Sequence, residues 1–361
     1  MLHLMTEAAN SVPVTILTGF LGSGKTTVLN HLLRQPSLAD TVVIVNEFGA
    51  VGLDHLLIEQ AIEDAVLLKN GCICCTVRGD VADTLDMLWQ RREAGEIPPF
   101  RRIAIETTGL ADPAPVAHAL LAEPGARHAC RLDGIVTTVD ALHGPMQLQR
   151  QPEARRQVAM ADRILVTKTD IADVSQIAAT EAAIAALNDT APLRHVLGGA
   201  ADAADVFDLG PDNGRLEQWL RPLDADAHHS HRHLAFRHAE EIGSVVLRHD
   251  QPVDWPALKF WLESVLSLRG DAVLRLKGIV WLHGEQRPIV LQSVHHVVHP
   301  PARLDQDVQP AGATRLVLIT RGLSSAGLRA SFATALGNRY TASLTAIPGR
   351  LSSGTCVLGG R

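Results

Sequence analysis

The feature that most constrains this chain is a glycine-rich segment close to its N-terminus. Residues 19–26 read Gly-Phe-Leu-Gly-Ser-Gly-Lys-Thr, which matches the pattern G-x-x-x-x-G-K-[ST] of a phosphate-binding loop, or P-loop. An apolar, β-branched stretch at 12–17 precedes it, and residues 27–33 follow with apolar side chains at helical spacing. A strand, a glycine turn and a helix start together aim backbone N–H groups and the positive end of the helix at a polyphosphate. The segment therefore predicts a nucleotide-binding α/β domain.

The P-loop pattern also assigns roles to its residues. Gly22 and Gly24 let the backbone curl around the phosphates, and Lys25 is expected to reach the β- and γ-phosphates. The hydroxyl of Thr26 is expected to bind Mg²⁺. A triphosphate with Mg²⁺ is therefore the first ligand that we expect.

Bulk composition narrows the class of protein. The 361 residues suffice for two domains, and the formal net charge of −6 gives general nucleic-acid binding no electrostatic support. No segment approaches the ~18–20 uninterrupted apolar residues of a membrane span, and residues 1–11 show no secretory signal. Three of the five cysteines crowd into positions 72, 74 and 75, which suits a reducing compartment. We therefore expect a cytoplasmic protein that binds neither nucleic acid nor a membrane.

Over residues 1–222, strand candidates alternate with helical stretches, which favours a mostly parallel sheet flanked by helices. The expected strands after the P-loop are Val42–Asn46, Arg102–Glu106, Gly134–Val139, Arg163–Thr167 and Arg194–Val196. The expected helices are Val81–Arg92, Pro115–Leu121, Pro152–Ala159 and Asp173–Leu187. Ligands should collect at the C-terminal ends of these strands.

The pattern changes after residue 222. Residues 223–240 are polar and predict a linker, whose histidines either gather metal or are merely solvated: His228, His229, His231 and His233. Residues 241–336 predict a smaller α+β domain with an antiparallel sheet, and 337–361 a flexible tail. The expected elements of the smaller domain are strand Ile242–Arg248, helix Trp255–Leu268, strands near Ala272–Leu282, Pro288–His299 and Thr314–Arg321, and helix Ser325–Leu336.

Two further motifs bear on the nucleotide. The apolar strand at 103–105 ends in Glu106, which could hold Mg²⁺ directly or through water, and Gly109 just beyond could offer its N–H to a γ-phosphate. Thr167-Lys168-Thr169-Asp170 follows a later strand and resembles the guanine-reading element [N/T]-K-x-D. The Asp170 carboxylate could accept hydrogen bonds from guanine N1–H and the 2-amino group, a pair that adenine cannot supply. GTP is therefore favoured over ATP.

A cysteine-rich segment, Gly71-Cys72-Ile73-Cys74-Cys75, predicts metal binding, because thiolates hold Zn²⁺ strongly. In an extended segment Cys72 and Cys74 share a face and could chelate one ion, whereas Cys75 joins them only if the chain turns. Two thiolates leave a tetrahedral ion short of ligands, so a histidine, a carboxylate or a second chain must complete the site. A buried small-residue turn and a redox-sensing thiol remain alternatives.

Taken together, these motifs resemble the CobW family of P-loop GTPases. The segments that carry the resemblance occur in the family's order over residues 12–334: Gly19–Thr27, Asn46–Gly49, Gly71–Cys75, Glu106–Gly109, Val139–His143, Thr167–Asp170, Leu274–Ile279 and Val294–His296. The resemblance implies a GTPase domain followed by a CobW-type C-terminal domain. It also implies a GTP-dependent metallochaperone for zinc, or for cobalt in corrinoid synthesis.

The resemblance implies residue roles as well. The expected phosphate and Mg²⁺ residues are Gly22, Ser23, Gly24, Lys25, Thr26 and Thr27. Asn46 and Glu47 would lie on the first switch segment near the γ-phosphate, and His143 matches a histidine of an accessory metal site. The implied metal motif is Cys72, Cys74 and Cys75, with the first two the expected ligand pair. Ala50 stands where many members have Glu, which puts any accessory site that uses this carboxylate in doubt.

The expected function is therefore Mg²⁺-dependent hydrolysis of GTP coupled to delivery of Zn²⁺ or Co²⁺. The expected catalytic residues are Lys25, Glu47 and Glu106. The expected partner is a client metalloprotein or an enzyme of a metal-cofactor pathway, and a homodimer is left open. Two alternatives are a metal-storing or sensing protein with weak GTPase activity and a P-loop kinase that acts on a small molecule.

Overall fold

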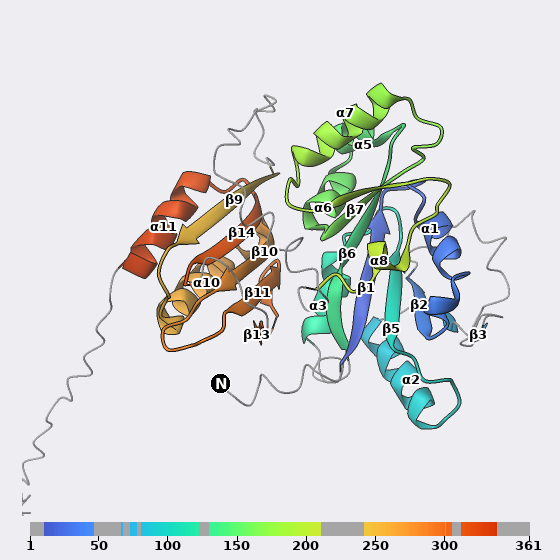
Figure 1. The fold of residues 1–361 in the computed structure, drawn as a ribbon, viewed down its shortest axis with the longest axis horizontal. Coiled ribbons are helices and arrows are strands. Elements are labelled where there is room, and N and C mark those ends of the chain that lie inside the picture. Colours follow the sequence, from blue (N-terminus) through green and yellow to red (C-terminus); the bar gives the residue numbers. More distant parts are fainter. Residues whose placement is uncertain are drawn as a thin grey trace, which may run out of the picture.

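Two β-sheets organise the molecule, each with its own helices (Figure 1). The computed structural model describes residues 11–46, 66–67, 73–77, 81–122, 130–210, 242–299, 301–304 and 312–337. The expected fold class, a mostly parallel sheet flanked by helices and followed by a smaller α+β domain with an antiparallel sheet, is confirmed.

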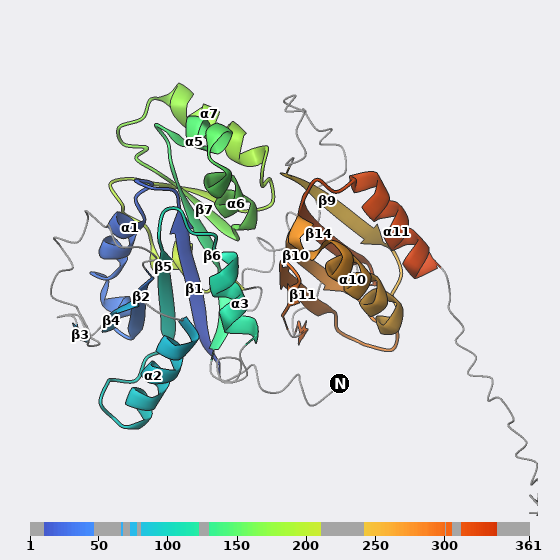
Figure 2. The same ribbon diagram turned by 180° about the vertical axis from the view of Figure 1, so that it is seen from behind.

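The first sheet has the strand order β3-β4-β2-β5-β1-β6-β7-β8 over the described residues. Its strands are β1 (Val12–Gly19), β2 (Thr41–Asn46), β3 (Val66–Leu67), β4 (Ile73–Val77), β5 (Arg102–Thr107), β6 (Cys130–Asp140), β7 (Arg163–Thr167) and β8 (Leu193–Val196). All neighbouring pairs are parallel except β3 with β4. The helical segments are α1 (Lys25–Leu32), η3 (Pro36–Leu38), α2 (Val81–Glu93), α3 (Ala114–Ala122), α5 (Gly144–Arg150), α6 (Pro152–Met160), α7 (Val174–Ala185) and α8 (Ala203–Val206). Figure 2 shows α3 lying across β1 and β6.

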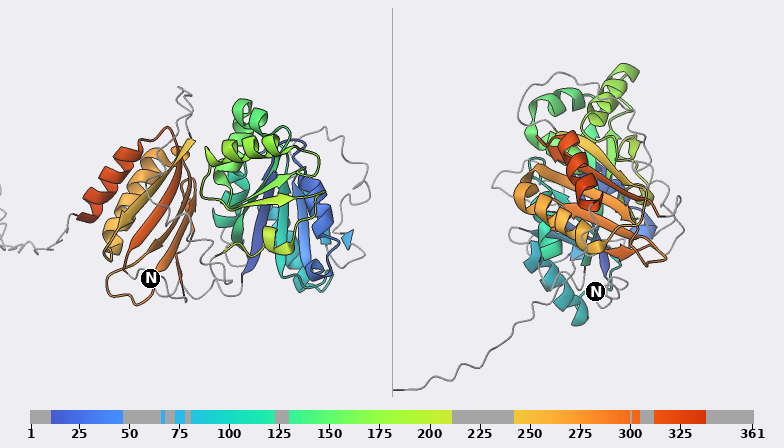
Figure 3. Two further views of the ribbon diagram at one scale, coloured as in Figure 1. Left: turned by 45° about the horizontal axis from the view of Figure 1, so that its top comes forward. Right: turned by 90° about the vertical axis from the view of Figure 1, so that its left-hand side faces the viewer.

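The second sheet is antiparallel, with the order β12-β11-β10-β14-β9 and β13 paired to β11. Its strands are β9 (Ile242–His249), β10 (Val273–Val280), β11 (Ile289–Val294), β12 (Val297–Val298), β13 (Ala302–Arg303) and β14 (Thr314–Arg321). Helices α10 (Trp255–Arg269) and α11 (Ser325–Gly337) cover the face that points away from the first sheet, and the short η5 (Gly270–Ala272) precedes β10 (Figure 3).

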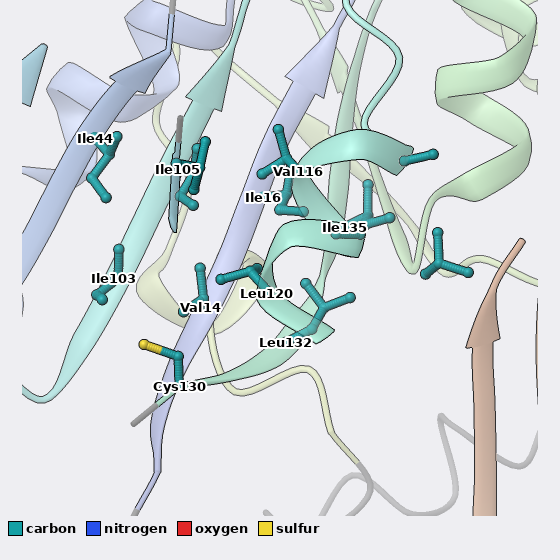
Figure 4. Close-up of a cluster of buried hydrophobic side chains, with 14 of the residues drawn as sticks. Val14, Ile16, Ile44, Ile103, Ile105, Val116, Leu120, Cys130, Leu132 and Ile135 are labelled. Atoms are coloured by element: carbon teal, nitrogen blue, oxygen red, sulfur yellow. The ribbon is translucent and has the colours of Figure 1, made fainter. Parts of the chain in front are cut away.

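The parallel sheet is buried on both faces, as parallel sheets require. On one face β1, β2, β5 and β6 pack against α2, α3 and α6, through side chains such as Ile16, Ile105 and Leu120 (Figure 4). On the other face Leu17 and Val136 pack against α1 and α8. Cys130 belongs to the first of these cores, and burial with the nearby Asp86 raises its pKa to about 12. Its thiol is therefore neutral at physiological pH.

The uncovered face of the antiparallel sheet meets the first domain. Helices α3 and α6 contact β10, β11 and β12. Ile242, Leu274, Val294 and Ile319 of the second sheet join the hydrophobic cluster of the first domain. The β10–β14 register shifts between Val273 and Arg275. The contact between the domains thus includes an apolar cluster continuous with the core of the first domain.

Most expected elements are confirmed with small shifts at their ends, and β7 and β14 match their expected ranges. The single strand expected near Pro288–His299 is wrong, because the chain turns at His295 and His296 and forms two antiparallel strands, β11 and β12. Helix α5 was not expected, although Pro145 at its first turn is a common helix start. Cys74 and Cys75 belong to strand β4, in agreement with the extended segment considered for these cysteines and against the alternative of a small-residue turn. The expected linker and tail lie outside the described residues, apart from Gly337, which ends α11. No helix in the described part of the chain is long and apolar enough to cross a membrane.

Candidate functional site

The P-loop connects β1 to α1 at the C-terminal edge of the parallel sheet. Gly24 caps α1 in the left-handed conformation, with φ 92°, which a residue with a side chain rarely adopts. Ser23 is fully buried, and its hydroxyl lies 2.6 Å from that of Thr138 at the end of β6. The loop is thereby fixed to the neighbouring strand, so its backbone N–H groups are held in place for a phosphate.

Lys25 folds back over this loop. Its Nζ donates hydrogen bonds to the carbonyl oxygens of Gly19 at 2.8 Å and Phe20 at 3.3 Å, and the residue is 8% exposed. The cation therefore lies on the loop that the sequence assigns to the triphosphate, where it can neutralise phosphate charge.

Thr26 and Glu106 come together from different elements. Thr26 Oγ1, at the start of α1, donates to Glu106 Oε1, at the end of β5, over 2.7 Å. Glu106 is buried, at 6% exposed. A hydroxyl and a carboxylate in contact are the oxygen donors that Mg²⁺ prefers, so the two residues fit an Mg²⁺ ion beside the P-loop.

The Thr167–Asp170 motif lies at the end of β7, next to the P-loop. The hydroxyl of Thr167 donates to the carbonyl oxygen of Ser23 over 2.7 Å, which ties the motif to the phosphate-binding segment. Asp170 Oδ1 accepts a bond from the backbone N–H of Gly198 at 3.3 Å, in the loop after β8. The sheet thus brings the expected base-reading residues to the same edge as Lys25.

A buried aspartate, Asp140, organises this end of the site. Its carboxylate accepts bonds from Lys168 Nζ at 2.7 Å and from the backbone N–H of Leu142 at 2.7 Å, and it lies 3.0 Å from His143 Nδ1. Burial would raise the pKa of Asp140, but the bonds from Lys168, His143 and Leu142 lower it below its ordinary value. The carboxylate is therefore ionised and holds Lys168, whose own φ is 58°.

His143 lies beside Asp140, the carboxylate that also holds Lys168. Its imidazole is 56% exposed and contacts Asp140. An accessory metal role for His143 stays a prediction.

The metal motif is only partly within the described residues. Glu47 and Cys72 lie outside them, while Cys74 and Cys75 are described as backbone positions of β4. In register, Cys74 pairs with Val43 and Cys75 with Ile44 on β2. Because β2 pairs on its other side with β5, a single strand separates the cysteine strand from the strand that carries Glu106. Among the described side chains, no group of three or more His, Cys, Asp or Glu could hold a metal ion.

Two contributors to the site were not foreseen from the sequence. Thr138 fixes Ser23, and the fully buried Gln157 on α6 donates to the carbonyl oxygens of Gly109 and Ala111 at 3.2 and 2.9 Å. A glutamine at a core position of a helix, between Ala154 and Val158, is the one signal that could have revealed Gln157.

Comparisons with known proteins agree with this geometry. Residues 13–195 match the CobW/HypB/UreG nucleotide-binding domain, and residues 242–336 match the cobalamin synthesis protein cobW C-terminal domain. The chain is 35% identical over 288 residues to a protein of Escherichia coli K12 named zinc chaperone YjiA, covering 80% of this chain and 87% of that protein. It is 31% identical over 368 residues to one named zinc chaperone CobW from a Sinorhizobium species, covering 91% and 99%.

A solved structure shows the same architecture. The crystal structure described as Zn(II)-bound YjiA GTPase from E. coli superposes with a TM-score of 0.68 at 30% sequence identity, and the match covers 90% of this chain and 99% of that chain. The likeness therefore extends over both domains.

Proposed function

Because the chain belongs to the CobW/HypB/UreG family, we propose that it is a GTP-hydrolysing metallochaperone that delivers zinc to a client protein. The chain is a GTPase, and GTP with Mg²⁺ is its nucleotide ligand. The two long relatives described above are both named zinc chaperones, and the YjiA crystal structure is described as Zn(II)-bound. The observation that carries the proposal is the position of the cysteine strand, β4, in the same sheet as the nucleotide site.

On the nucleotide side, contacts support a role for Lys25, Thr26, Glu106 and Lys168. Lys25 would neutralise the β- and γ-phosphates, and Thr26 with Glu106 would hold Mg²⁺, which would offset the charge that develops on the β-phosphate as GDP leaves. Lys168 is steadied by Asp140, while Asp170 reads the guanine edge. Gly109 offers its N–H to the γ-phosphate. Glu47 would act from the switch segment that follows β2.

On the metal side, the donor set is a run of thiols. Cys72, Cys74 and Cys75 supply soft donors that suit Zn²⁺ and disfavour Mg²⁺ and Ca²⁺. Strand β2 pairs with β4 and then leads into Glu47, so nucleotide at the switch and metal at the cysteines act on the two ends of one strand pair. We infer that GTP tightens the thiolate site and that hydrolysis loosens it, which releases metal to the client.

The client is a protein that requires a transition metal, and we place the exchange in the cytoplasm, because crowded thiols favour a reducing compartment. A homodimer, whose second chain could complete the thiolate site, stays a prediction.

A zinc titration tests the coupling. In competition with a chromophoric chelator, the protein should bind Zn²⁺ about tenfold tighter with a non-hydrolysable GTP analogue than with GDP, within the usual range of allosteric coupling. Equal zinc affinities in the two nucleotide states would contradict the proposal.

Two variants separate the alternatives. Lys25→Ala should abolish both GTP turnover and the nucleotide-dependent difference in zinc affinity, whereas a storage protein would keep its zinc affinity unchanged in every nucleotide state. Cys74→Ser should remove zinc binding, whereas a small-molecule kinase would keep its phosphate transfer unaffected by that change.

A further inference from the structure

Helix α6 lies between the nucleotide site and the second domain. Its buried residues face the GTPase core, and it contacts strand β10 of the antiparallel sheet. Gln157, near its centre, is fully buried. A buried amide is costly unless its hydrogen-bonding groups are used, and in the described residues the Oε1 of Gln157 has no partner, so the two bonds that its Nε2 donates indicate what holds it there.

Gln157 is bonded to the loop that follows β5. Its Nε2 donates one hydrogen bond to the carbonyl oxygen of Gly109 at 3.2 Å and a second to that of Ala111 at 2.9 Å. The same loop is closed by a bond from Ala111 N–H to the carbonyl oxygen of Thr108 at 3.1 Å. The amide thus uses both of its hydrogens to fix one turn, Thr108–Ala111.

This turn is pressed against the P-loop. A Cβ atom built on Gly109 would lie 2.6 to 2.8 Å from atoms of Leu21, including its backbone N and Cα. Contacts that short do not occur, so only glycine lets the turn approach the P-loop this closely. The position of Gly109 relative to the P-loop is therefore set by contacts on two sides, with Leu21 on one side and Gln157 on the other.

The helix that carries Gln157 is itself anchored across the domain interface. Asp162, two residues after α6 ends, accepts a bond from the backbone N–H of Ile135 at 2.8 Å, a bond from Arg275 Nη2 at 2.8 Å, and one from Lys277 Nζ. Burial would raise the pKa of Asp162, but Arg275 and Lys277 lower it to about 2. The carboxylate is thus ionised and locks the end of α6 to strand β10.

We propose that Gln157 is a positioning residue for GTP hydrolysis: it holds the Gly109 turn against the P-loop, and the Asp162–Arg275–Lys277 cluster holds Gln157. The C-terminal domain thereby helps to set the geometry of hydrolysis in the other domain. The inference rests on the proposed role of Gly109 at the γ-phosphate and is independent of zinc delivery.

Gln157→Met tests the first link, because it keeps the volume and helix propensity but removes both donors. With zinc-free protein, we expect single-turnover GTP hydrolysis to slow about tenfold, as small misplacements of reacting groups do. The affinity for a fluorescent GDP should stay within about twofold, because Lys25 and the Thr167–Asp170 motif still hold the nucleotide. Gln157→Leu, which removes the same donors with a differently shaped side chain, should likewise slow hydrolysis and leave the affinity for GDP nearly unchanged.

The matched control is Thr137→Val. Thr137 donates to the backbone carbonyl of Gln157 at 2.8 Å but does not bond to the Gly109 turn. It should hydrolyse GTP within about twofold of the wild-type rate, at the usual cost of one lost hydrogen bond in stability. An unchanged rate in both Gln157 variants, or an equal loss in Thr137→Val, would overturn the proposal.

A double-mutant cycle tests the second link. Arg275→Met should slow hydrolysis several-fold in the wild-type background and have no further effect in the Gln157→Met background, because the two residues act through the same turn. Additive losses would show that the domain interface does not act through Gln157. Since no zinc is present in either assay, a failure of metal coupling would leave both results unaffected.

Discussion

Two buried aspartates, at opposite ends of β6 and β7, each hold a cationic side chain, but they differ in where that cation lies and in what it contributes. Asp140 ends β6 and holds Lys168 with two backbone N–H groups, those of Leu142 and His143. Asp162 precedes β7 and holds Arg275 and Lys277 with one backbone N–H, that of Ile135. The first carboxylate lies at the ligand edge of the sheet, and the second lies at the domain interface.

The difference lies in what each partner cation can do when released. Lys168 is 34% exposed at its side chain, so it can reach water, or a ligand, if Asp140 is lost. The Arg275 side chain is 3% exposed and comes from the other domain, so it cannot reach water if Asp162 is lost. The carboxyl ends of the strands thus carry a charge pair that can be adjusted for binding, while the amino ends carry one that fixes the fold.

The largest effect is expected at Asp162. Asp162→Asn leaves Arg275 buried without its counter-ion and should lower the free energy of unfolding by about 3–5 kcal/mol. Urea denaturation followed by circular dichroism measures this. The control is Glu285→Gln, which breaks the half-exposed Arg303–Glu285 pair and should cost less than about 1 kcal/mol. A loss at Asp162 no larger than at Glu285 would mean that the interface does not depend on the buried charge.

The second effect is a dependence on pH. Because the folded pKa of Asp162 is about 2 and its ordinary value is 3.8, the folded state binds its proton less readily than the unfolded state. The ionised Asp162 therefore contributes about 2 kcal/mol to the free energy of unfolding above about pH 4. This contribution is lost as the pH falls towards about 2. Urea denaturation at several pH values in that range should show that the difference in free energy of unfolding between wild type and Asp162→Asn becomes smaller as the pH falls. A constant difference would contradict the assigned ionisation.

The contrast between the two clusters also explains what the sequence could predict. The P-loop, Glu106 and the Thr167–Asp170 motif were found because each is a short run at a strand end, where local chemistry fixes local geometry. Most helices and strands followed for the same reason, since their apolar periodicity is local.

The remainder depends on partners that are distant in sequence. Asp162 and Arg275 are 113 residues apart, and no local pattern pairs them. Gln157 likewise finds its hydrogen-bond acceptors only when the Gly109 loop packs against α6. For Cys74 and Cys75 the sequence left an extended segment and a turn open, and pairing with β2, a partner distant in sequence, decides for the strand.

The smallest effect is expected at Asp140, and it should appear in binding rather than in folding. Asp140→Asn keeps the shape and an acceptor for Leu142 but removes the charge that holds Lys168. A lost charge-assisted bond of about 1.5 kcal/mol corresponds to a roughly tenfold weaker Kd for fluorescent GDP, with less than about 1 kcal/mol lost from stability since Lys168 can be hydrated. Asp173→Asn is the control, because Asp173 caps α7 and makes no bond to Lys168. If Asp140→Asn destabilised the fold as much as Asp162→Asn and left GDP binding unchanged, the division of labour between the two ends of the sheet would be wrong.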